Sequence, residues 1–356
     1  MLTNTIAVCL LCVVAVQAPP PGPGGASGKG DAPSTTTAAT TTPAVADTEG
    51  VDSAYVVKEI TCTDSQYDGL TLVDSSIADK QAETGDNDDA IADKVLALFT
   101  SETQCTGDFR SFSGKCDDDA QRVKPWYYEK QVTFNGEQRL LIITNSMPDH
   151  CSSLDRVIAN PNMPCETLRA ALLPLSATKG TFTEWGMGEI GLAVTGGTIY
   201  NHKSDELDCN IAYESEGETL DACGGHADAN KVYHYHAAPA CAQDSSSCGL
   251  LGYLLDGIPI YGLCTVTLAD GTTVEMKSGY SGSGCLASGY AWTGAGTLDE
   301  ANGYTFQQDA TSLDGAVSFA AGDYVYFFDD VYPYSVVGYY GSSLSTLCGF
   351  STSDLD

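Results

Sequence analysis

The sequence predicts a mainly β protein of antiparallel strands in a sandwich-like, hairpin-rich arrangement, with a few short helices. Turn signals recur at short intervals without alternating helical patterns, which favours antiparallel sheets over an α/β fold. Glycine (37 residues) and tyrosine (19 residues) are abundant, as in chains of short strands and tight turns. Hydrophobic residues make up 43% of the 356 residues, which is enough for a substantial core.

The N-terminal residues indicate an extracellular protein. Residues 1–18 contain an apolar run that is too short to cross a bilayer, followed by small residues before Ala18, as in a secretory signal peptide. Residues 19–50 are rich in Thr, Pro and Gly and predict a disordered spacer. No later segment is apolar over the 18 residues that a membrane span needs. We therefore expect a secreted protein without a membrane span.

The cysteines fit an oxidising compartment. Cys9 and Cys12 lie in the predicted signal peptide, and twelve cysteines remain in the mature chain. An even number of cysteines in a secreted protein predicts disulfide bonds, six if all of them pair, although their spacing does not determine the pairing. None of the twelve forms the Cys-x-x-Cys pair of a structural zinc site. The mature domain is therefore expected to be disulfide-bonded.

The charge of the chain restricts its partners. Acidic residues outnumber basic residues 47 to 16, and the formal net charge is -31. Nucleic acid and anionic membranes both require a basic surface, so neither is expected as a partner. No nucleotide cofactor is expected either. A metal ion and an extracellular matrix component remain as candidate partners.

Two regions follow the spacer. Residues 51–130 are expected to form an accessory region with one amphipathic helix, because apolar side chains recur at helical spacing within residues 88–102, with Asp88 or Asp89 as the N-cap. Residues 131–350 carry the strand and hairpin signals and are expected to form the main domain.

Hairpins are the clearest local signal in this domain. Asn135-Gly136 separates two strand-like runs and tolerates the positive φ angles of a type I′ turn. Residues 191–200 and 252–261 also share the pattern Gly-x-x-x-[Thr/Asp]-Gly-x-x-Ile-Tyr at a constant offset. Each copy predicts a strand, a tight turn and a second strand. Two similar hairpins that arose by chance, or a duplicated sheet unit, would each explain this repeated pattern.

The histidines are few and clustered. All five lie in the main domain: His150, His202, His226, His234 and His236. If Tyr233-His234-Tyr235-His236 is extended, both imidazoles share one face of a strand and both tyrosines share the other. Two adjacent imidazoles repel when both are protonated, and a bound cation removes that cost by holding them neutral. The pair therefore predicts half of a metal site.

Other residues complete the predicted site. His226 follows a Cys-Gly-Gly turn that is expected to bring it near the pair, and His150 follows a predicted strand and is a candidate fourth ligand. Imidazole ligands favour Cu(II) or Zn(II). Side chains that orient a ligand, act as general acid or base, or stabilise developing charge are expected among Asp149, Asp221, Asp256, Tyr233 and Tyr235.

The central motifs resemble those of the YHYH-domain family. The resemblance is carried by Cys223 to His226, by the Tyr-His-Tyr-His tetrapeptide, by Ala238-Pro239 and by residues 250–262, and it extends over about residues 130 to 350. It implies a mostly secreted or membrane-associated family without a settled biochemical function. The family positions carried over to this chain are His226, Tyr233, His234, Tyr235, His236, Asp256, Gly257 and Pro259.

One stretch departs from the family pattern. Similar proteins often have a Tyr-x-Tyr-His-like stretch before a Pro-Tyr signature, whereas residues 324–328 of this chain contain no histidine. If that position supplies a ligand in other members, the site here is either incomplete or uses Asp329 or Asp330 instead.

The sequence leaves several classes of function open. The first is a secreted protein that binds copper or zinc through its histidines for storage, capture or delivery. The second is a metal-dependent hydrolase or oxidase, since three histidines with an open water position make a catalytic arrangement. The third is an acidic extracellular matrix or adhesion component without a metal site. In a fourth, the tyrosines and histidines only stabilise the fold, and a partner binds another face.

Overall fold

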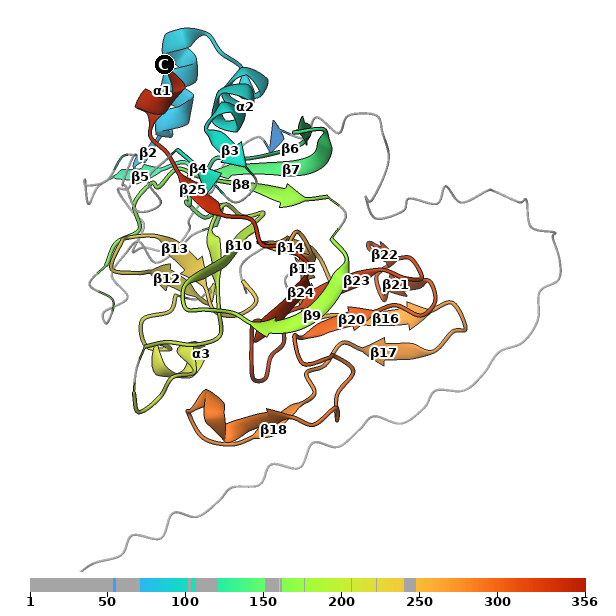
Figure 1. The fold of residues 1–356 in the computed structure, drawn as a ribbon. Coiled ribbons are helices and arrows are strands. Elements are labelled where there is room, and N and C mark those ends of the chain that lie inside the picture. The colour runs from blue at the N-terminus through green and yellow to red at the C-terminus, as the bar shows by residue number, and fades with distance from the viewer. Residues whose placement is uncertain are drawn as a thin grey trace, which may run out of the picture. The chain divides into compact units, whose positions relative to one another are not determined.

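The structure, a computed structural model, is dominated by strands and has few helices, which confirms the predicted mainly β fold (Figure 1). The predicted signal peptide and spacer lie outside the described residues, and everything below concerns the unit formed by residues 41–356. The structure describes residues 54–55, 71–101, 104–106, 115, 121–150, 160, 162–175, 177–205, 207–221, 223–239 and 248–356.

A five-stranded antiparallel sheet forms one layer. Its strands, in spatial order, are β1 (Ala54–Tyr55), β6 (Tyr127–Phe134), β7 (Glu137–Thr144), β8 (Arg169–Pro174) and β25 (Leu347–Gly349). The predicted hairpin is β6–β7, and it turns at Asn135 and Gly136, whose φ angles are 51° and 85°. Positive φ at both residues is what a type I′ turn requires, and Asn and Gly adopt it at little cost.

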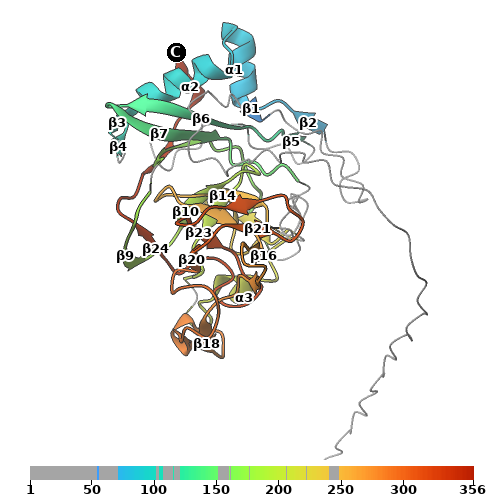
Figure 2. The ribbon, with the colours of Figure 1, turned by 90° about the vertical axis from the view of Figure 1, so that its right-hand side faces the viewer.

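Two helices cover one face of this sheet (Figures 1 and 2). The expected helix is α2 (Asp88–Ala97), which ends earlier than the apolar pattern suggested. Its N-cap is Asn87 and not Asp88 or Asp89 as predicted, because the Asn87 side chain accepts the Ala90 N–H. A second helix, α1 (Ser76–Thr84), was not anticipated. It buries only Ile77 among its apolar residues, so its sequence carries little periodic signal.

The second layer is an eight-stranded sheet. Its strands, in spatial order, are β12 (Gly225–Ala227), β13 (Tyr233–Tyr235), β11 (Thr198–Tyr200), β10 (Glu189–Ala193), β14 (Leu250–Leu254), β15 (Pro259–Tyr261), β23 (Tyr324–Phe327) and β20 (Gly303–Thr305). The pairs β11–β13 and β15–β23 are parallel and the others are antiparallel. Parallel neighbours need long crossover connections, and here those connections carry the smaller elements.

The two sheets face each other across the main core. Alternate residues of β7 divide between the layers: Ile142 packs with residues of the eight-stranded sheet, whereas Leu141 and Ile143 pack under the helices. Tyr235 and Tyr326 reach the same core from the eight-stranded sheet. The arrangement is therefore a β-sandwich with an outer helical layer.

Smaller elements complete the fold. A four-stranded sheet of β17 (Thr273–Glu275), β16 (Thr265–Leu268), β21 (Ala310–Ser312) and β22 (Ser318–Phe319) forms a further core with Val325 and Phe327 of β23. The remaining elements are β2 (Thr71–Val73) with β5 (Gln121–Val123), β3 (Phe99–Ser101) with β4 (Gln104–Cys105), β9 (Lys179–Glu184) with β24 (Gly338–Gly341), β18 (Tyr280–Gly282) with β19 (Tyr290–Trp292), α3 (Ala212–Ser215), η2 (Ala287–Gly289) and η3 (Thr352–Leu355).

The eight-stranded sheet repeats one four-stranded unit. The hairpins β10–β11 and β14–β15 pair in the same register and bulge at the same position. Strands β10 and β14 then pair reciprocally at the centre of the sheet. On the outer side, Tyr235 lies beside Ile199 just as Tyr326 lies beside Ile260. The pattern shared by residues 191–200 and 252–261 therefore marks a duplicated sheet unit.

The outermost strands repeat as well. In the first copy, Asp221 accepts hydrogen bonds from the Tyr233 hydroxyl (2.7 Å) and from the Gly225 N–H (3.2 Å). In the second copy, Asp299 accepts equivalent bonds from the Tyr324 hydroxyl and the Gly303 N–H. A Cβ at either glycine would collide with the neighbouring tyrosine hydroxyl, so both positions require glycine.

Disulfides hold distant parts of the fold together. Three link pairs of described residues: Cys105–Cys348, Cys209–Cys285 and Cys248–Cys264. Cys165 and Cys223 are disulfide-bonded too, so every cysteine among the described residues is oxidised, as expected. Cys62, Cys116, Cys151 and Cys241 lie outside the described residues. No helix in the described part of the chain is long and apolar enough to cross a membrane.

Candidate metal centre

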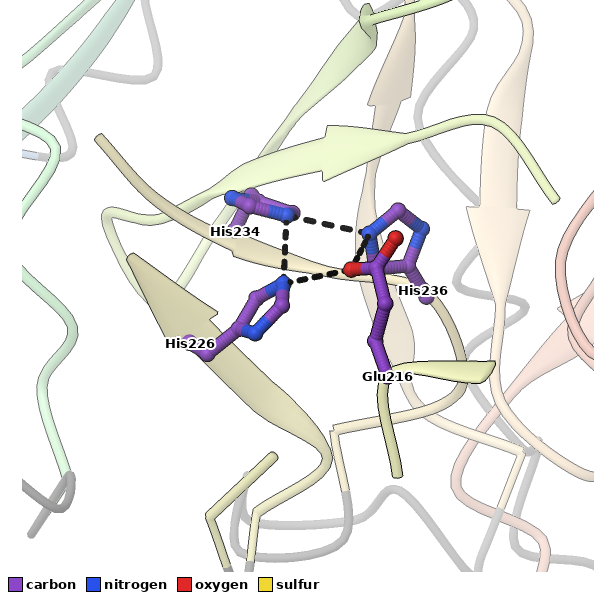
Figure 3. A group of neighbouring side chains, drawn as sticks. All are labelled: Glu216, His226, His234 and His236. Carbon is purple, nitrogen blue, oxygen red and sulfur yellow. Dashed lines mark hydrogen bonds and ion pairs between the residues drawn. The ribbon is translucent and has the colours of Figure 1, made fainter. Parts of the chain in front are cut away.

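Three histidines converge at one edge of the eight-stranded sheet. His226 of β12 lies directly opposite His234 of β13, and His236 follows two residues later on the same face. The Nε2 atom of His234 is 3.0 Å from the Nε2 atoms of both His226 and His236 (Figure 3). The predicted cluster of His226, His234 and His236 is therefore present in the structure.

Glu216 is the fourth member of this cluster. It follows α3, and its Oε2 atom lies 3.0 Å from Nε2 of His226 and 3.5 Å from Nε2 of His236 (Figure 3). One potential ligand atom from each of the four residues lies within 4.8 Å of all the others. Glu216 was not among the residues predicted from the sequence, because it lies in an irregular acidic segment whose path depends on tertiary contacts.

The far nitrogen of each ring is already engaged. Nδ1 of His234 is 3.1 Å from the Val232 carbonyl oxygen, and Nδ1 of His236 is 2.9 Å from the Asn201 carbonyl oxygen. A carbonyl only accepts, so these Nδ1 atoms carry the hydrogen, and in the neutral rings Nε2 presents a lone pair. Nδ1 of His226 is 2.7 Å from the Thr219 hydroxyl. The rings are thus oriented as metal ligands usually are.

Burial opposes protonation of the central ring. Desolvation, followed by the neighbouring His236 and His226, lowers the pKa of His234 well below its usual value. Burial alone would raise the pKa of Glu216, but the neighbouring His226 and His236 outweigh burial and lower that pKa to about 2. The cluster therefore combines an ionised carboxylate with three imidazole rings whose Nε2 atoms lie close together. A cation between them would bind the carboxylate and the Nε2 lone pairs at once.

Tyr200 closes one side of the cluster. Its ring stacks on the His234 ring, with centroids 3.7 Å apart and an angle of 17° between the planes. Its hydroxyl donates to Asp228 at 3.0 Å, which fixes the ring in place. This contact holds His234 in the orientation that points Nε2 at the other ligands.

The structure places His150 apart from the cluster. Its Nε2 atom is 2.5 Å from the Tyr235 hydroxyl, which also lies 2.9 Å from the Thr195 hydroxyl. Tyr235 points into the core between the sheets, on the opposite face of β13 from His234. The Asp149 N–H donates to the Thr195 carbonyl oxygen, so Asp149 belongs to this second group.

The other candidate residues lie outside the histidine cluster, and Asp221 and Asp256 make hydrogen bonds within the two sheet units. Asp221 and Tyr233 hydrogen-bond to each other in the repeated unit described above. Asp256 lies in the second copy, where it accepts from the Tyr326 hydroxyl and the Gly341 N–H, and burial raises its pKa to about 6. Asp329 and Asp330 line a separate cavity of about 330 Å³ beside the Cys248–Cys264 disulfide. None of these carboxylates belongs to the histidine cluster.

Fold and site together define a disulfide-bonded β-sandwich with a cluster of three histidines and one glutamate at a sheet edge. The model of the family described as YHYH protein matches residues 170–341, so this chain contains a YHYH domain, as the motifs indicated. That range includes both copies of the repeated unit and all four cluster residues. No curated protein and no solved structure matches the chain.

Proposed function

We propose that this protein is a secreted metal-binding protein that holds Cu(II) or Zn(II) through His226, His234, His236 and Glu216. One observation carries the proposal: buried Nε2 atoms lie 3.0 Å apart while the Nδ1 atoms of their rings already face oxygen atoms. In a tetrahedral zinc site with bonds of about 2.1 Å, ligand atoms lie roughly 3.4 Å apart, so small adjustments suffice. Capture, storage or delivery of the metal is the corresponding role.

The duplicated sheet supports a functional role for the histidines. The second copy keeps the two tyrosines, as Tyr324 and Tyr326, but has Val325 and Phe327 where the first copy has His234 and His236. Both of these residues are packed in an apolar core. The fold therefore forms this unit without histidines, and the histidines of the first copy serve a purpose that the scaffold alone does not require.

Donor chemistry and charge support the choice of metal. Imidazole with one carboxylate suits Zn(II) and Cu(II) better than Ca(II) or Mg(II), which prefer oxygen ligands alone. The net charge of -31 favours the approach of cations to the protein. Disulfide bonds between described residues are consistent with an extracellular location, where the protein would meet its metal.

The proposal is tested by elemental analysis of the full-length secreted protein, purified without a histidine tag or chelating resin. The native protein should contain close to one copper or zinc ion per chain, and the double variant His234→Ala/His236→Ala should contain none. His202→Gln is the matched control, since His202 is equally buried but lies outside the cluster. A folded native protein that contains no metal and takes up none on titration would refute the proposal.

A further inference from the structure

The four proposed ligands are held with unequal firmness. The histidines are in or next to strands, their rings are fixed through Nδ1, and their side chains are almost fully buried, with 8% of His226 and 3% of His236 exposed. The Glu216 side chain is 24% exposed. Its residue is the C-cap of α3, a four-residue helix whose N-cap makes no side-chain hydrogen bond. The Glu216 backbone is hydrogen-bonded to Ala212 and Thr219, so the difference lies in its side chain, which is the most exposed of the four.

Among the described residues, only histidines pair with the Glu216 carboxylate. Within the described part of the chain, its Oε2 atom contacts only Nε2 of His226 and Nε2 of His236, and no backbone N–H donates to it. Asp221 shows how this fold fixes a carboxylate, since two backbone N–H groups and the Tyr233 hydroxyl donate to it. Glu216 has no comparable set of donors.

Glu216 is the most exposed member of the cluster. Tyr200 covers His234 by stacking, and Thr219 contacts His226 through Nδ1. Glu216 enters from a segment separate from the two strands that carry the histidines, and it is the partly exposed member of the cluster (Figure 3). When its carboxylate moves away, three histidines remain around an open coordination position.

We propose that Glu216 is an exchangeable ligand and that its position on the bound metal takes a small anionic donor from solution. This inference rests on the proposed metal site. A divalent ion bound by three neutral imidazoles and one carboxylate has a net charge of +1 together with its ligands. When a monoanion replaces the carboxylate on the metal, this net charge stays the same. The three histidines keep the metal in place while the fourth position changes occupant, which is the arrangement that metal catalysis and ligand sensing both require.

The test uses azide as the probe and the copper-loaded full-length protein. Azide bound to Cu(II) produces a charge-transfer absorption band, so binding is followed directly in the visible spectrum. The variants are Glu216→Ala and, as a matched control, Glu218→Gln, which removes an exposed carboxylate two residues away. Ionic strength is kept at about 0.2 M to screen the acidic surface. Copper content is measured before azide is added.

The expected result has three parts. The native protein binds one azide per copper, Glu218→Gln behaves in the same way, and Glu216→Ala retains its copper and binds azide about tenfold more tightly, because no internal carboxylate competes for the position. Absence of azide binding to the copper-loaded native protein, together with binding to Glu216→Ala, would overturn the proposal, and so would loss of copper from Glu216→Ala. A native protein without copper would refute the metal site itself, and that failure is visible before the titration begins.

Discussion

At the scale of single residues, the cluster depends on close contacts in the strand beside it. Gly225 lies against the Tyr233 ring, and a Cβ at this position would collide with the Tyr233 hydroxyl, which is hydrogen-bonded to Asp221. We expect Gly225→Ala to reduce the free energy of unfolding by about 1–3 kcal/mol. Chemical denaturation of the metal-free protein measures this loss.

Gly186→Ala is the matched control for that substitution. No atom lies within 4 Å of the Cβ that it adds, so its effect should stay within about 0.5 kcal/mol. Equal effects of the two substitutions would show that the contact between Gly225 and Tyr233 is not what constrains this strand.

Buried His202 makes the stability of the protein depend on pH. Burial, more than any other cause, lowers the pKa of His202 from its usual 6.5 to about 3. The unfolded chain therefore binds a proton at His202 between these pH values while the folded chain does not. The difference in pKa costs no stability above pH 6.5. The free energy of unfolding then decreases as the pH falls from 6.5 toward 3, with a slope of at most about 1.4 kcal/mol per pH unit.

Denaturation of the metal-free protein between pH 7 and pH 4 measures this slope. The variant His202→Gln has no titratable group at this position, so its stability should fall less steeply than that of the native protein as the pH decreases. Parallel pH profiles for the two proteins would contradict the lowered pKa.

At the scale of elements, the repeated unit separates scaffold from site. Tyr326 repeats Tyr235 in the second copy, and its hydroxyl donates to Asp256 at 2.8 Å and accepts from the Tyr340 N–H at 2.8 Å. Tyr326→Phe leaves both partners without that bond, so we expect a loss of about 1–3 kcal/mol in the free energy of unfolding. Metal content should not change, because the cluster lies in the first copy.

Tyr339→Phe provides the comparison. The Tyr339 ring packs on Trp185, with centroids 4.5 Å apart, and its hydroxyl makes no hydrogen bond within the described structure. This substitution should therefore be nearly neutral in thermal denaturation. A penalty as large as that of Tyr326→Phe would mean that the buried hydrogen bonds of the second copy contribute little.

The elements also show what the sequence could and could not predict. Alternation in a strand was enough to place His234 and His236 on one face, and a turn was enough to bring His226 near them. Glu216 could not be found, because no local pattern determines where the segment after a one-turn helix lies. His150 follows a strand as expected, but its ring reaches Tyr235 on the other face of β13. Periodicity fixes the face of a residue within one strand, whereas contacts between strands depend on topology.

At the scale of the whole chain, a disulfide joins Cys105 of β4 to Cys348 of β25, the last strand. Cys105 and Cys348 are 243 residues apart in the sequence, whereas Cys248 and Cys264 are 16 residues apart. A crosslink that closes a longer loop restricts the unfolded chain more. We expect the double variant Cys105→Ser/Cys348→Ser to lose about 2–5 kcal/mol of unfolding free energy.

Cys248→Ser/Cys264→Ser serves as the reference, because it removes a bond of the same kind that closes a short loop. Its loss should be the smaller of the two in the same denaturation experiment. An equal or larger loss would indicate that strain or residual structure in the unfolded state, rather than loop length, governs the stability of this chain.

The proposed metal site connects these scales, since the histidines lie on a repeated sheet whose other copy lacks them. Its most direct test is anomalous X-ray diffraction from crystals of the protein, with data collected on both sides of the copper and zinc absorption edges. We expect one anomalous peak about 2.0–2.1 Å from Nε2 of His226, His234 and His236. Absence of any peak there, in crystals soaked with either metal, would refute the metal site.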